Sequence, residues 1–123
     1  MDNDLLDEAI EYLCEELKRY IDKEYINLFV RLLITPGVVC FSTKDLFDFL
    51  SSKEKWNVLI TDHLCDILDL DSDKVFVIIE ANKEFTLEDF HKIEDILKKN
   101  RKNAMFHVII NDSLRHPMFY VLY

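Results

Sequence analysis

A continuous apolar run at residues 75–79, Val-Phe-Val-Ile-Ile, restricts the fold of this chain more than any other feature of the sequence. Consecutive residues of a strand point to opposite faces of a sheet, so a strand without polar alternation is buried on both faces. Other elements must then cover each face of that strand. The run therefore predicts a central strand, with helices packed on its sheet.

Three more apolar runs predict further strands, at residues 56–60, 105–110 and 118–123. Side chains that commonly cap helices stand at the start of three helical segments: Ser42 or Thr43, Thr61 or Asp62, and Thr86. Asp45 follows Ser42 at the spacing of a capping box. The element order predicts a two-layer α+β fold, with a mixed sheet of about four strands packed against helices.

The first 35 residues form a helical region that precedes the α/β region at residues 36–123, within one predicted domain. Apolar residues recur at alternating steps of four and three along one stripe: Leu6, Ile10, Leu13, Leu17 and Tyr20. Charged residues 22–24 interrupt the pattern, which then continues to Pro36 and Gly37. This is either one long helix, straight or slightly kinked, or two helices with a break near Asp22. We favour the long helix.

The composition argues against several classes of function. The net charge of -9 opposes binding to nucleic acid or to an anionic membrane surface. A single glycine, Gly37, cannot build a Gly-rich phosphate loop. The first residues are acidic, unlike a signal peptide, and no apolar run reaches membrane-spanning length. We expect a cytoplasmic protein without nucleic acid or membrane partners, whose acidic surface serves solubility or a basic partner.

The cysteines form no close pair that would indicate a disulfide. Cys14, Cys40 and Cys65 are odd in number, so we interpret them as reduced, small core residues. His63 lies two residues before Cys65, but no second pair completes a metal-binding pattern. No metal or cofactor is predicted.

The histidines do not define a catalytic site in the sequence. We interpret His63 as a surface or capping residue and His107 as a core or sheet-edge residue. His91 and His116 are expected to face solvent. A nucleophilic Cys-His pair stays open, because such partners meet in space and not in sequence. No catalytic residue is predicted.

Three stretches of the chain are similar to consecutive parts of one known domain. Residues 33–39, Leu-Ile-Thr-Pro-Gly-Val-Val, resemble the end of its central helix and a Pro-Gly exit. Residues 75–88 resemble its strand, turn and helix start, and residues 104–114 resemble its next strand and turn. The domain is the C-terminal domain of the FtsZ/tubulin family of cytoskeletal GTPases. The resemblance covers residues 17–123 and implies a stand-alone relative of that domain, without the family's GTP-binding domain.

The loop after the Pro-Gly pair departs from the family. The family's loop reads Asn-x-Asp-x-x-Asp, and its acidic side chains help to activate water at the nucleotide of the next subunit. Aligned on Pro36 and Gly37, this chain has Cys40, Ser42 and Asp45 at those positions. Cysteine cannot orient water as an amide does. We therefore expect a degenerate loop without GTPase activity, in which Asp45 starts a helix.

Two segments are candidates for binding a partner. The stripe from Leu6 to Tyr20 either packs on its own domain or pairs with a partner helix or a second copy. The last strand either lies inside its own sheet or adds to another. We predict a non-catalytic protein-interaction domain that modulates an FtsZ/tubulin-like filament. The alternatives are an acidic antitoxin or phage-type inhibitor that neutralises a basic protein and, third, a small-molecule enzyme; a homodimer is compatible with the stripe.

Overall fold

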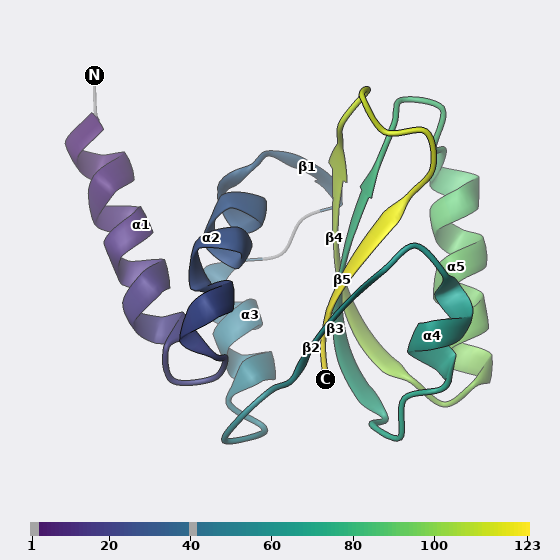
Figure 1. Cartoon of the computed structure of the whole chain (residues 1–123), viewed down its shortest axis with the longest axis horizontal. Coiled ribbons are helices and arrows are strands. Elements are labelled where there is room, and N and C mark those ends of the chain that lie inside the picture. The colour runs from purple at the N-terminus through teal and green to yellow at the C-terminus, as the bar shows by residue number, and fades with distance from the viewer. Residues whose placement is uncertain (1–2, 40–41) are drawn as a thin grey trace.

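A computed structural model describes residues 3–39 and 42–123 and places a mixed five-stranded sheet between two sets of helices (Figure 1). The strands are β1 (Gly37–Val39), β2 (Val58–Thr61), β3 (Lys74–Ala81), β4 (Asn103–Ile110) and β5 (Met118–Leu122). Their order in the sheet is β1-β4-β3-β5-β2. β3 and β4 are parallel, and the other neighbours are antiparallel.

The helices lie on both faces of the sheet, which adds a layer to the two that the sequence predicts (Figure 1). On one side are α1 (Asn3–Leu17), the 3-10 turn η1 (Lys23–Tyr25), α2 (Ile26–Ile34) and α3 (Thr43–Leu50). On the other side are α4 (Leu64–Leu68) and α5 (Leu87–Lys99), the helix that connects the parallel strands β3 and β4. None of the helices within the described residues is both long and apolar enough to span a bilayer.

β3 is the central strand, and its burial on two faces is confirmed. Phe76 and Ile78 join the core under α2 and α3, whereas Val77 and Ile79 join the core under α5. All four side chains are fully buried. Because successive side chains of this apolar run point into opposite cores, β3 packs against a helical layer on each face of the sheet.

The prediction of one long N-terminal helix is wrong, because the chain breaks between α1 and α2. Asp22 has an extended backbone, with φ -65° and ψ 144°. In the break, the carbonyl of Tyr20 accepts a hydrogen bond from the backbone N–H of Trp56 at 2.7 Å. A continuous helix would need that carbonyl for its own ladder. The break lets α2 run back alongside α1, as Figure 1 shows.

β1 is the strand that the sequence analysis misses, since it indicates only a helix stop at Pro36 and Gly37. Gly37 and Val39 pair with Ile109 and Val108 of β4. A Cβ atom on Gly37 would lie 2.6 Å from both the Cε1 of His107 and the carbonyl oxygen of Val108. The close approach of β1 to β4 therefore requires glycine, and the sheet has five strands instead of about four.

Two of the predicted helix caps are confirmed. Ser42 accepts the backbone N–H of Asp45 at 3.0 Å and caps α3. Thr86 and Asp89 form a reciprocal capping box at the start of α5, with bonds of 3.1 and 2.9 Å. The residue before α4 is His63, one position after Asp62 and two after Thr61, the two predicted caps.

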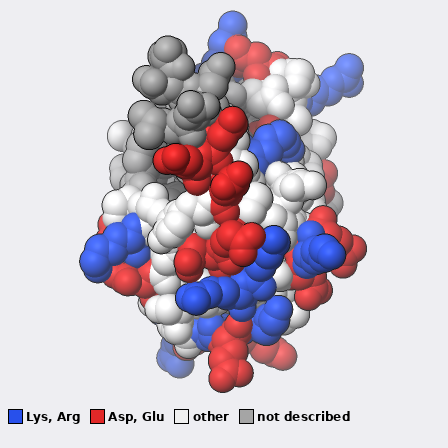
Figure 2. Space-filling view, turned by 90° about the vertical axis from the view of Figure 1, so that its left-hand side faces the viewer, with Lys and Arg blue, Asp and Glu red and all other residues white. Residues whose placement is uncertain are grey.

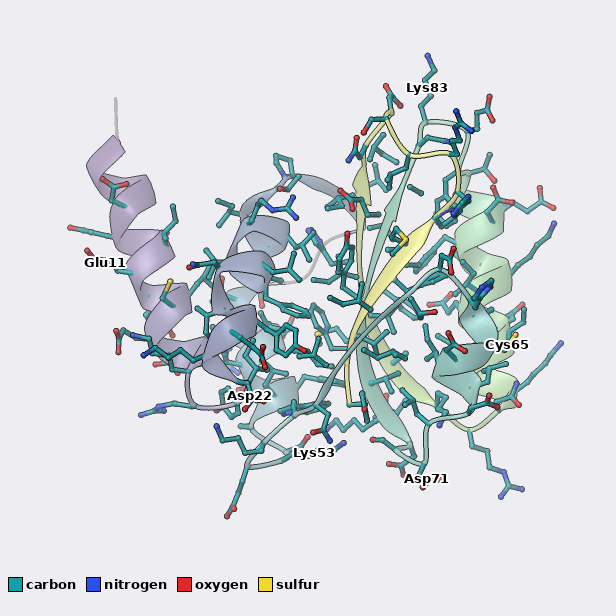
Figure 3. All side chains as sticks on the ribbon, viewed as in Figure 1. Glu11, Asp22, Lys53, Cys65, Asp71 and Lys83 are labelled. Carbon is teal, nitrogen blue, oxygen red and sulfur yellow. The ribbon has the colours of Figure 1, made fainter. Side chains whose placement is uncertain are left out.

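Neither of the two cysteines that the structure describes is fully buried in the core, although the sequence analysis predicts core residues. Cys65 is exposed on α4, as Figure 3 shows, because Ile67 is the residue that this short helix buries. Its interpretation as a core residue is therefore wrong. Cys14 is half-buried beside the core, and Cys40 lies outside the described residues.

Candidate functional site

The degenerate loop leads from β1 into the first turn of α3. Ser42 and Asp45 are both exposed there, and Cys40 lies outside the described residues. The Ser42 side chain is engaged in capping α3 through the Asp45 N–H. The Asp45 carboxylate stands in the first turn of the helix, where the helix dipole favours a negative charge.

His107 lies at the junction of β4, β1 and the end of α2. It is 5% exposed, and its Nε2 lies 3.2 Å from the carbonyl oxygen of Thr35. Its ring also rests against Gly37, whose missing side chain leaves the space. The interpretation of His107 as a core residue is confirmed. Its contacts with Thr35 and Gly37 hold the chain segment after α2 against the sheet.

A second buried polar cluster, centred on Glu80, lies at the end of β3. Tyr120 donates its hydroxyl proton to Glu80 Oε1 at 2.8 Å, and the side-chain amide of Asn111 donates to Oε2 at 3.1 Å. Burial, followed by the hydrogen bond to Glu80, raises the pKa of Tyr120 to about 12. Because both carboxyl oxygens accept hydrogen bonds within the fold, this cluster joins β3, β5 and the turn after β4.

The sequence analysis misses the Glu80 cluster. The available signal is one carboxylate at the end of an apolar run, where buried acids are rare without partners. Its donors lie far along the chain, so the sequence does not identify them.

The proposed partner-binding stripe on α1 faces α2. Leu17 is fully buried, and Ile10, Leu13 and Tyr20 are half-buried against the same core. The backbone of Leu6 belongs to α1, but its side chain is outside the described part of the structure. The structure thus brings the described members of the stripe together, on the inner side of α1 and of the turn that follows it.

The outer side of α1 is charged. Figure 2 shows Asp and Glu side chains down the middle of this face, with Lys and Arg gathered toward its lower end. Glu8, Glu11 and Glu15 are exposed on α1, and Glu11 points away from the molecule in Figure 3. This face differs in character from the apolar stripe behind it.

A small surface cluster joins the end of β2 to the loop before β5. Asp62 lies 3.2 Å from the Nε2 of His63 and 3.3 Å from the Nε2 of His116, and both imidazoles are exposed. His116 and the exposed His91 face solvent as expected. Within residues 3–39 and 42–123, no group of three or more His, Cys, Asp or Glu side chains could hold a metal ion.

The arrangement of elements can be compared with known proteins. No protein-family model and no curated protein matches the sequence of this chain. Among solved structures, it is similar to a mutant FtsZ from M. jannaschii, with 15% identity and a TM-score of 0.58 over 99% of this chain and 40% of that one. An empty FtsZ dimer from M. jannaschii matches with 11% identity and a TM-score of 0.56, over 76% of this chain and 33% of that one.

The chain therefore has an FtsZ-like α+β fold, and the fold expected from the sequence resemblance is confirmed. It spans 33–40% of the length of these FtsZ chains. At 11–15% identity, the likeness shows the fold alone.

Proposed function

We propose that this chain is a non-catalytic protein-interaction domain that modulates an FtsZ/tubulin-like filament. The observation that carries the proposal is the match of nearly the whole chain to a part of FtsZ. One of the similar structures is an FtsZ dimer. A domain shaped like part of such a subunit can occupy one of its contacts and leave the next position in the filament unfilled.

The surroundings of the degenerate loop support the non-catalytic part of the proposal. Ser42 uses its hydroxyl to cap α3, and Asp45 is the one carboxylate retained from the family's loop pattern. A single exposed carboxylate at a helix start lacks the partners that orient water for hydrolysis. The domain would thus bind a filament subunit without contributing to GTP hydrolysis.

Co-sedimentation with FtsZ polymers tests this function. With increasing amounts of the chain, we expect less FtsZ in the pellet and slower GTP turnover. Unchanged polymer mass and unchanged GTP turnover at tenfold molar excess of the chain would contradict the proposal.

The exposed start of α3 offers a matched test of the binding surface. The double variant Lys44→Glu, Asp45→Lys exchanges two charges beside the degenerate loop, where both side chains are exposed. A control, Lys92→Glu, changes a charge on α5, on the other side of the sheet. We expect the first variant to lose the effect on FtsZ polymers and the control to keep it.

A second candidate function is neutralisation of a basic protein, as by an antitoxin or a phage-type inhibitor. It is supported by the acidic outer face of α1 and by the net charge of -9 (Figure 2). The test is co-purification with the product of a neighbouring reading frame that encodes a small basic protein. Changing Glu8, Glu11 and Glu15 together to Lys should abolish co-purification, and retention of the partner would exclude this face.

A further inference from the structure

On the α5 side, the part of the sheet next to β1 leaves apolar side chains in solvent. Val38 of β1 is 67% exposed, and Leu87 at the start of α5 is 64% exposed. Ile110, at the end of β4, is also exposed. These residues are far apart in the sequence but line one groove. A well-covered sheet would bury them.

The groove has a volume of about 310 Å³ between β1, the end of β4 and the start of α5. Its apolar lining consists of Val38, Phe85, Leu87, Phe90, Val108 and Ile110. Val108 and Phe90 are buried and form the floor, whereas Val38 and Leu87 stand at the rim. This arrangement can receive apolar side chains from outside.

The strand that borders the groove, β1, lies at the edge of the sheet. It is the outermost strand of the sheet, with β4 as its strand neighbour on one side. An edge strand can pair with an extended segment of another chain. Alternate side chains of a strand added along β1 would lie on the same face as Val38, over the groove.

The charges around the groove favour a basic ligand. Glu84 and Glu88 are exposed on the segment that carries Phe85 and Leu87, and Asp112 is exposed just after Ile110. Lys83 projects from the turn above β3 in Figure 3, and the Nζ of Lys92 lies 3.9 Å from the carboxylate of Glu88. The charged side chains around the groove are therefore of both signs. With a net charge of -9 for the chain, a segment with Lys or Arg between its apolar residues complements this rim.

We propose that the groove between β1 and the start of α5 binds an extended basic segment of another protein, which adds a strand to β1. Its apolar side chains enter the groove, and its basic side chains meet Glu84, Glu88 and Asp112. The site lies on the α5 side of the sheet, away from α1. It does not depend on whether the partner belongs to a filament.

A nine-residue peptide that alternates valine and lysine, with both ends blocked, is a direct probe. In NMR titrations we expect saturable shifts of the backbone amide signals of Val38, Leu87 and Ile110. A matched peptide that alternates valine and glutamate should cause no such shifts. Equal binding of the two peptides, or shifts confined to α1, would overturn the proposal.

Variants on one helix supply the matched control. Leu87→Lys places a charge at the groove rim, whereas Ile96→Lys makes the same change at a 38% exposed position of α5 outside the lining. We expect at least tenfold weaker peptide binding for the first and unchanged binding for the second. The spectra without peptide verify that both variants fold. Equal affinity of Leu87→Lys and the original chain would refute the groove as the site.

Two further outcomes separate the basic segment from other occupants. The double variant Glu84→Lys, Glu88→Lys keeps the apolar lining, and it should weaken peptide binding and reduce its salt dependence. Shifts of the same amide signals that grow with protein concentration, without peptide, would mean that a second copy of the chain occupies the groove. That result would overturn the assignment of a basic partner.

Discussion

The two sides of the sheet differ in the kinds of side chain that they bury. On the α2 side lie the two ionisable residues that are buried in the described part of the chain, Glu80 and His107, each with polar partners. On the α5 side, apolar residues such as Val77, Ile79 and Leu97 form the core. Both sides are stabilised by apolar burial, and the α2 side adds two buried ionisable side chains that need particular partners.

This difference affects how uniquely each side specifies the fold. Apolar contacts tolerate small displacements, whereas an unpartnered buried polar group is costly. Glu80 accepts from Tyr120 on β5 and from Asn111 after β4, so a shifted strand would lose both bonds. The Glu80 bonds therefore constrain the register of β3 against its neighbours, in addition to the apolar burial that both sides share.

The largest expected effect comes from adjacent isoleucines of β3 that face opposite sides. Ile78 and Ile79 are both fully buried, in the α2-side and α5-side cores respectively. We expect Ile78→Ala and Ile79→Ala each to lower the free energy of unfolding by about 2–5 kcal/mol, measured by urea denaturation. A loss below about 1 kcal/mol for either variant would contradict a core on both faces.

Next in size is the removal of one polar partner on the α2 side. Tyr120→Phe deletes the donor to Glu80 Oε1, and we expect it to lower the free energy of unfolding by about 1–3 kcal/mol. The control is Tyr12→Phe at an exposed position, where a change within about 0.5 kcal/mol is expected. Equal effects of the two variants would mean that the hydrogen bond from Tyr120 to Glu80 does not stabilise the fold.

Helix caps on opposite sides of the sheet give a smaller effect. We expect Ser42→Ala on α3 and Thr86→Ala on α5 each to lower the free energy of unfolding by about 0.5–2 kcal/mol. Thr86→Ala should cost more, because Thr86 belongs to a reciprocal capping box. Thermal unfolding measures both, and the variants Ser42→Thr and Thr86→Ser should restore most of the stability.

The smallest expected effect is the titration of Tyr120. It leaves stability at neutral pH unchanged and appears only in alkaline solution. The pKa of Tyr120 in the folded protein, about 12, lies above the ordinary tyrosine value of 10.0. The corresponding stability is present below pH 10 and is lost as the pH rises toward 12. Absorbance at 295 nm should show a tyrosine that titrates late, and Tyr120→Phe should remove it. A late titration that persists in this variant would assign it to another tyrosine.

Local patterns predicted those parts of the fold that depend on neighbouring residues. The run at 75–79 identified the central strand, and Thr86 identified the start of α5. The FtsZ-like fold also followed from three short stretches of sequence. For the strand and the helix start, the physical cause, burial or capping, lies within the segment itself.

The missed features depend on residues far apart in the chain. The break before α2 involves the bond between Tyr20 and Trp56, and β1 exists because Gly37 fits against His107. The groove next to α5 combines Val38, Leu87 and Ile110, none of which forms a motif with the others. Sequence spacing does not report such contacts, so the site could not be predicted.

The position of β5 between β3 and β2 has a consequence for protein synthesis. Val58 of β2 pairs with Leu122 of β5, although more than half of the chain lies between them. A ribosome must therefore release residues 118–122 before β2 has any neighbour in the sheet. Until then, β3 keeps an open edge toward the missing strand. These unpaired strand edges raise the risk of mispairing in the nascent chain.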